Sequence, residues 1–176
     1  EIDNVQELKF VGIGESDFHD QLDDELGNID GLEVGYCARL GEVDLRLIGS
    51  DAVIAQGRNL TVSKFREFLI SDDGANLESV VVRELSKLGK TLTTAESCTG
   101  GLVASRLTDI SGASSVFTHG FVSYSNDAKE QLIGVSRDTL AAHGAVSEEV
   151  ASEMAKGARL ASGSDYSISI TGIAGP

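Results

Sequence analysis

The stretch 93-TTAESCTGGLVASRL-107 predicts a short strand, a turn and a helix, in that order. Its first residues favour a strand, and the apolar spacing after the glycines favours a helix, which we expect over 98–109. Two residues that can act as nucleophiles, Ser97 and Cys98, lie at the turn. The start of a helix also offers free backbone N–H groups and a partial positive charge, which suit an oxyanion or a phosphate. The stretch therefore predicts an α/β domain with a candidate ligand site at this turn.

A candidate base lies in a second segment, 124-YSNDAKEQL-132. Ser125 or Asn126 is placed to cap a helix there, which puts Lys129 in the first turn, where the helix end is already positive. This field, combined with partial burial, would lower the pKa of the lysine and favour its neutral amine. A serine that needs a base and a lysine that favours neutrality suggest a dyad of Ser97 and Lys129.

Structural explanations stay open for each of these residues. In that interpretation Ser97 only caps the helix, and Gly100 and Gly101 allow tight packing rather than the close approach of a ligand. Lys129 would then face solvent and pair with a neighbouring acidic residue. Cys98 is a rival nucleophile, but one residue inside the expected helix it should point away from Ser97 and contribute to packing.

A third segment, 170-ITGIAGP-176, predicts a strand that leads into a glycine-rich loop. The loop amides and the Thr171 hydroxyl would lie at the carboxyl edge of the sheet, the usual place for ligands in open α/β sheets. Such loops are common, so this segment is evidence only together with the other two.

The overall composition excludes several classes of protein. Of the 176 residues 41% are apolar and 24% charged, which is ordinary for a globular protein. No apolar run approaches the ~20 residues of a membrane span, and no signal-peptide pattern opens the chain, so we expect a soluble cytoplasmic protein. The 2 cysteines and 3 histidines have no metal-ligand spacing. The net charge of −14 argues against nucleic acid as a partner.

Charge divides the chain into two parts. Residues 1–75 carry 17 acidic and 6 basic side chains, against 11 and 8 in residues 76–176. The segment 71-SDDGAN-76 is typical of a linker, so we expect a small α+β domain over 1–72 and a layered α/β/α domain over 77–176. Because the chain does not begin with methionine and ends in a loop, we interpret it as an interior piece of a longer protein. The second domain would then lack its C-terminal part.

The spacing of apolar and turn residues predicts the elements of each part. Those of the first part are a helix over 15–26, two strands within 33–50 that turn at 40–42, and a helix over 60–70. Those of the second part are a helix over 77–88, strands at 91–95, 115–125 and 165–171, the helix over 98–109, a helix from 126 and one capped by Ser147. In the first helix, Phe18, Leu22 and Leu26 share one face.

Three segments together resemble the CinA family of competence/damage-inducible proteins. They are AESCTGG at 95–101, GFVSYSNDAK at 120–129, and HGAVSEEVASEMAKGA at 143–158 followed by TGIAGP. The similarity covers about residues 77–176. More specifically, these segments resemble the family's C-terminal domain, the nicotinamide mononucleotide deamidase also called PncC. In the first part, FVGIGESDFHDQL and LGEVDLRL resemble the KH-type domain that precedes the deamidase domain in full-length CinA proteins.

The resemblance implies an enzyme, an amidohydrolase of pyridine-nucleotide recycling. It would hydrolyse the carboxamide of nicotinamide mononucleotide to nicotinate mononucleotide and ammonia, with no metal and no other cofactor. Ser97 matches the family's nucleophile and Lys129 its base, and backbone N–H groups at the helix start would hold the oxyanion. The other matched positions line or border the substrate pocket: Thr99, Gly100, Gly101, Tyr124, Asn126, Thr171 and Gly172. We expect a homo-oligomer, a dimer.

Functions of other classes stay open. The second part would then be a catalytically inactive nucleotide-binding domain, or the chain would be a structural fragment whose acidic first part is a spacer or an oligomer contact. An RNA-binding KH module is disfavoured, because residues 1–75 contain no GxxG loop and carry a net charge of −11.

Overall fold

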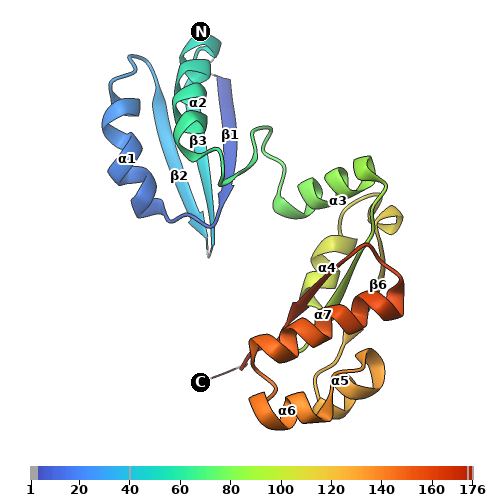
Figure 1. Cartoon of the computed structure of the whole chain (residues 1–176). Coiled ribbons are helices and arrows are strands. Elements are labelled where there is room, and N and C mark those ends of the chain that lie inside the picture. Colours follow the sequence, from blue (N-terminus) through green and yellow to red (C-terminus); the bar gives the residue numbers. More distant parts are fainter. Residues whose placement is uncertain (1–3, 40, 174, 176) are drawn as a thin grey trace. The chain divides into compact units, whose positions relative to one another are not determined.

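The computed structural model describes residues 4–39, 41–173 and 175. The chain divides into two compact units, Glu1–Val80 and Val81–Pro176. Each unit has its own sheet and its own buried core. Figure 1 traces the chain through both units, from blue in the first unit to red at the end of the second.

The first unit is a four-stranded sheet with two helices packed against it (Figure 1). Its elements are β1 (Asn4–Val11), α1 (Glu15–Gly27), β2 (Glu33–Arg39), β3 (Glu42–Gly49), α2 (Asp51–Phe65) and β4 (Leu69–Ser71). The strand order is β2-β3-β1-β4, and all neighbours are antiparallel. Phe18, Leu22 and Leu26 of α1 are buried against the sheet, which confirms the predicted apolar face. The predicted strand pair is confirmed as β2 and β3, although residue 40 of its turn lies outside the described residues.

The helix predicted over 60–70 is wrong in both of its bounds. Helix α2 begins nine residues earlier, at Asp51, and ends at Phe65, and Leu69–Ser71 forms strand β4 beside β1. The run FREFLI is apolar enough for either structure, and pairing with a strand about 60 positions earlier in the chain decides between them. Strand β1 itself was not predicted.

The second unit is a parallel sheet between two layers of helices. Its elements are α3 (Leu77–Leu88, whose first residues precede the boundary between the units), β5 (Leu92–Glu96), α4 (Leu102–Thr108), a 3-10 turn (Ala113–Ser115), β6 (Phe117–Val122), α5 (Asn126–Ile133), α6 (Arg137–His143), α7 (Glu148–Ser162) and β7 (Tyr166–Ile170). The order is β6-β5-β7, so β5 is central and all five of its residues are buried.

Two separate clusters of apolar side chains hold these layers together. On one side Ala95 of β5 packs with Val150, Met154 and Ala158 of α7, and on the other Leu92 of β5 packs with Leu107 of α4. The expected class, an α/β/α layered domain preceded by a small α+β domain, is confirmed. No helix among the described residues is long and apolar enough to cross a membrane.

The parallel order brings three loops to one edge of the second sheet. Ser97 follows β5, Ser123 follows β6 and Thr171 follows β7, so all three lie at the carboxyl ends of adjacent strands. In open α/β sheets this is the edge at which ligands bind.

Candidate active site

Two backbone hydrogen bonds position Ser97 at the end of the central strand β5. Its amide donates to the carbonyl of Ile170 at 2.9 Å, and its carbonyl accepts from the amide of Gly100 at 3.1 Å. Gly100 and Gly101 then have φ of +61° and +99°, which side chains other than glycine rarely adopt. The result is a tight turn in which the Ser97 side chain is buried, with 6% of the residue exposed.

Lys129 reaches this turn from helix α5. The Ser125 hydroxyl accepts from the amide of Ala128, so Ser125 rather than Asn126 is the helix cap. Lys129 is 1% exposed, and its Nζ lies 3.0 Å from Ser97 Oγ, 2.9 Å from the Ser123 carbonyl oxygen and 3.4 Å from that of Tyr124. The two residues predicted as a dyad are thus in hydrogen-bond contact, although 32 positions separate them.

The surroundings of Lys129 favour its neutral form. Burial lowers the pKa of the amine, and the nearby Cys98 opposes this shift. No carboxylate among the described residues lies within ion-pair distance of Nζ. A neutral amine has two N–H groups and one lone pair, so it can donate to the two carbonyls and accept the Ser97 proton. The geometry therefore allows Lys129 to act as a base toward Ser97.

Glu96 is the residue that the sequence interpretation missed. Its carboxylate is 1% exposed and accepts from the amides of Gly101 at 3.0 Å, Val103 at 3.1 Å and Ala104 at 2.8 Å. Burial alone would raise the pKa of Glu96, but the Thr99 side chain and these three amides outweigh it and lower the pKa. An acidic residue just ahead of a glycine-rich helix start was the available signal, because free helix amides bind anions.

The position of this carboxylate corrects two expectations. Helix α4 begins at Leu102 and not at residue 98, because residues 97–101 turn around the Glu96 side chain. The amides at the helix start, expected to hold an oxyanion, are already bound to Glu96. Among the described residues, none accepts a hydrogen bond from the amides of Cys98 and Thr99, which directly follow the serine.

Cys98 therefore lies in the turn rather than inside the helix. It is half-buried, and a Cβ placed on Gly172 would come within 3.0 Å of its sulfur. Glycine at position 172 thus lets the loop after β7 approach Cys98. This contact fits the expected packing role of the cysteine.

The remaining predicted residues surround the dyad at different degrees of exposure. Thr99 is half-buried, and its buried hydroxyl lies close enough to the Glu96 carboxylate to lower the pKa of that group. A Cβ on Gly100 would meet nothing within 4 Å, whereas one on Gly101 would lie 3.4 Å from Val122. Gly100 is therefore open to a ligand, while Gly101 also permits close packing against β6.

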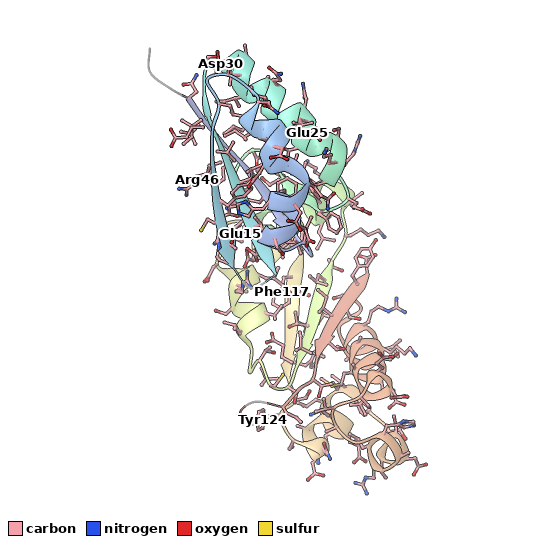
Figure 2. All side chains as sticks on the ribbon, turned by 90° about the vertical axis from the view of Figure 1, so that its left-hand side faces the viewer. Glu15, Glu25, Asp30, Arg46, Phe117 and Tyr124 are labelled. Atoms are coloured by element: carbon pink, nitrogen blue, oxygen red, sulfur yellow. The ribbon has the colours of Figure 1, made fainter. Side chains whose placement is uncertain are left out.

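The loop residues Tyr124, Asn126 and Thr171 differ in what they can offer a ligand. Tyr124 is 69% exposed and lies at the carboxyl end of the sheet (Figure 2), and Asn126 is exposed at the start of α5. The Thr171 hydroxyl donates to the carbonyl of Ala145 at 2.7 Å, so it anchors the loop after β7 and keeps only acceptor capacity. Residues 174 and 176 of the TGIAGP segment lie outside the described residues.

Two family descriptions match the chain in sequence. The CinA C-terminal domain matches residues 74–176, and the damage-inducible protein CinA KH domain matches residues 6–65. A CinA-like protein of Akkermansia muciniphila is 45% identical over 100% of this chain and 42% of its own length. A putative competence-damage inducible protein of Symbiobacterium thermophilum is 46% identical over 96% of this chain and 41% of its own. The chain thus spans about two fifths of the length of these curated relatives.

Solved structures of the same family resemble the chain over somewhat more than half of its length. The competence/damage-inducible protein CihA of Agrobacterium tumefaciens has a TM-score of 0.53 and 46% identity, covering 56% of this chain and 60% of its own. A CinA superfamily protein of Escherichia coli has a TM-score of 0.57 and 44% identity, covering 57% and 59%. From the two matched domains and the similarity to the curated relatives over nearly the whole of this chain, the chain belongs to the CinA family.

Proposed function

We propose that this chain is an amidohydrolase that converts nicotinamide mononucleotide to nicotinate mononucleotide and ammonia. The single observation that supports it best is the 3.0 Å contact between Ser97 Oγ and the buried Nζ of Lys129. A serine activated by a neutral lysine suits acyl transfer from an amide. The choice of substrate rests on the resemblance of the three motifs to the deamidase domain.

The proposed reaction uses the dyad twice. Lys129 takes the Ser97 proton while Oγ attacks the carboxamide carbon, and the amides of Cys98 and Thr99 would hold the oxyanion. The C–N bond then breaks, and Lys129 returns the proton to the leaving ammonia. Water, deprotonated by Lys129, attacks the acyl carbon; the bond from this carbon to Ser97 Oγ breaks, Lys129 returns the proton to Oγ, and nicotinate mononucleotide leaves.

Ammonia release from nicotinamide mononucleotide tests the proposal. We expect Ser97→Ala and Lys129→Met each to lower kcat/KM by at least about 10²-fold, because each removes a group that takes part in the chemical step. Ser105→Ala, an exposed serine on α4, is the matched control and should retain full activity. Activity that persists in Ser97→Ala would contradict the assigned nucleophile. Binding of the nucleotide by the wild-type chain without turnover would instead favour an inactive nucleotide-binding domain.

A further inference from the structure

We propose that Glu96 is a positioning residue: its carboxylate occupies the start of α4 and so holds the turn at 97–101 in the shape that leaves the Cys98 and Thr99 amides open to a substrate oxygen. The inference rests on the proposed function, because it concerns the same site. It adds a residue that does not itself touch the substrate.

The carboxylate of Glu96 replaces the ordinary cap of α4. The residue at the cap position is Gly101, which has no side chain to accept from the helix amides. Glu96 is the last residue of β5, yet its two oxygens accept from three amides of the turn and of the first helical residues. Each such bond to an ionised acceptor is stronger than one between neutral groups. The strand end and the helix start are therefore fastened together by one buried side chain.

This arrangement decides which backbone donors remain for a ligand. Gly100 donates to the Ser97 carbonyl at 3.1 Å and Leu102 to the Thr99 carbonyl at 3.0 Å, and the amides of Gly101, Val103 and Ala104 belong to Glu96. Between residues 98 and 104, the amides of Cys98 and Thr99 are those without an acceptor among the described residues. The negative charge of Glu96 also makes the helix start unfavourable for an anionic group of the substrate. The donors next to the nucleophile are thus preserved for the oxyanion.

Glu96 is connected to the base as well as to the nucleophile. Its carbonyl accepts from the amide of Ser123 at 2.8 Å, and the Ser123 carbonyl accepts from Lys129 Nζ at 2.9 Å. Ser97 follows it directly in the chain. A side chain that fixes this strand end therefore bears on both members of the dyad, and small displacements of reacting groups are costly in rate.

A residue that only stabilised α4 would change unfolding and leave the chemistry alone. The test therefore needs a measurement of Ser97 itself in the folded protein. A fluorophosphonate reagent provides it, because Ser97 Oγ would attack phosphorus, fluoride would leave and Lys129 would take the hydroxyl proton. The rate of mass gain reports on the nucleophile, its base and the oxyanion donors, independently of nicotinamide mononucleotide.

Three variants are compared with the wild-type chain by unfolding temperature, labelling rate, and kcat and KM for ammonia release. Glu96→Gln keeps the shape but loses the charge, and Glu96→Asp keeps the charge on a shorter stem. Glu148→Gln is the control, since Glu148 is an exposed acid in the first turn of α7. We expect labelling and kcat of Glu96→Gln to fall at least about 10-fold with KM nearly unchanged. Glu96→Asp should be intermediate, and Glu148→Gln should behave as wild type.

Folded Glu96→Gln protein that is labelled at the wild-type rate would overturn the inference and reduce Glu96 to a structural cap. If Glu96→Gln does not fold, the folded Glu96→Asp variant decides in the same way. A wild-type chain that is labelled at Ser97 but releases no ammonia would contradict the proposed substrate only. The labelling comparison would still decide the role of Glu96. A wild-type chain that is not labelled would contradict both.

Discussion

At the scale of single residues, the site is defined by Lys129, a buried amine surrounded by uncharged oxygen atoms. Burial lowers the pKa of this amine, and two backbone carbonyls and the Ser97 hydroxyl are its hydrogen-bond partners. Desolvation disfavours the charged form of a lysine, so the neutral amine of Lys129 becomes more available as the proposed base. The same shift has a consequence for stability.

We predict that activity and stability both rise with pH through the lowered pKa of Lys129. Activity should rise because the neutral amine is the proposed base. Stability rises because, between the folded pKa and the usual 10.5 of the unfolded chain, the unfolded state binds the additional proton. Ammonia release and denaturant unfolding, followed from neutral pH to about pH 10, measure the two effects. Lys129→Met should remove this rise in stability with pH, and Lys87→Met, on an exposed lysine, should not. An unchanged slope in Lys129→Met would contradict the prediction.

At the scale of elements, the helix that carries Lys129 depends on a close approach of α5 and α7. A Cβ placed on Gly157 of α7 would lie 1.6 Å from the carbonyl oxygen of Ile133 and 2.7 Å from its carbon. Both atoms are backbone, so no rotamer change could relieve the clash. Glycine at this position is what lets the two helices pack, and this packing places Lys129 beside the turn.

We predict that Gly157→Ala destabilises the second unit by about 1–3 kcal/mol, as overpacked substitutions do. This is the reverse of the usual gain when alanine replaces glycine inside a helix. Activity should fall as well, because α5 must move and carries Lys129. Denaturant unfolding and ammonia release provide the measurement. Gly27→Ala near the end of α1 is the control, since nothing lies within 4 Å of its added Cβ, and it should be neutral or slightly stabilising. A stabilised Gly157→Ala would show that the helices can separate at no cost.

At the scale of the whole molecule, the two units have separate cores. The buried cluster of the first unit centres on Phe18, whose ring lies 4.9 Å from that of Phe10 and 4.6 Å from that of Phe65. The clusters that support the Ser97 site contain residues of the second unit only. A substitution in one core should therefore destabilise mainly the unit that contains this core.

We predict that Phe18→Ala destabilises the first unit by about 3–5 kcal/mol, the usual cost of truncating a buried aromatic ring. The rate at which Ser97 is labelled in the native protein should stay unchanged. Met154 is a buried residue that packs with Ala95 of β5, so Met154→Ala should destabilise the second unit instead. The rate of Ser97 labelling should then change at a lower denaturant concentration than in the wild-type chain. Circular dichroism and labelling measured along one denaturant series separate the two cases. Equal sensitivity of Ser97 labelling to both variants would refute independent cores.

The sequence by itself determined the elements whose signals are local. The apolar stripe of α1, a helix cap at Ser125 or Asn126, the Ser147 cap and the strand pair at 33–50 follow from local spacing and side-chain chemistry. The structure confirms them and selects Ser125 as the cap. The three motifs also identified Ser97 and Lys129 as candidates, and the family match at 74–176 agrees with that resemblance. The roles of these residues stay predictions until the assays are done.

Only the tertiary structure decided how those residues meet. It brought Lys129 Nζ to within 3.0 Å of Ser97 Oγ, turned Leu69–Ser71 into a strand beside β1, and assigned the start of α4 to the Glu96 carboxylate. In each case the sequence allows more than one local structure or partner. Contacts formed in the folded chain select among them. Burial and hydrogen bonding depend on the complete fold. A lysine becomes a candidate base, and a glutamate a buried acceptor of backbone hydrogen bonds, only when the folded chain excludes water from them.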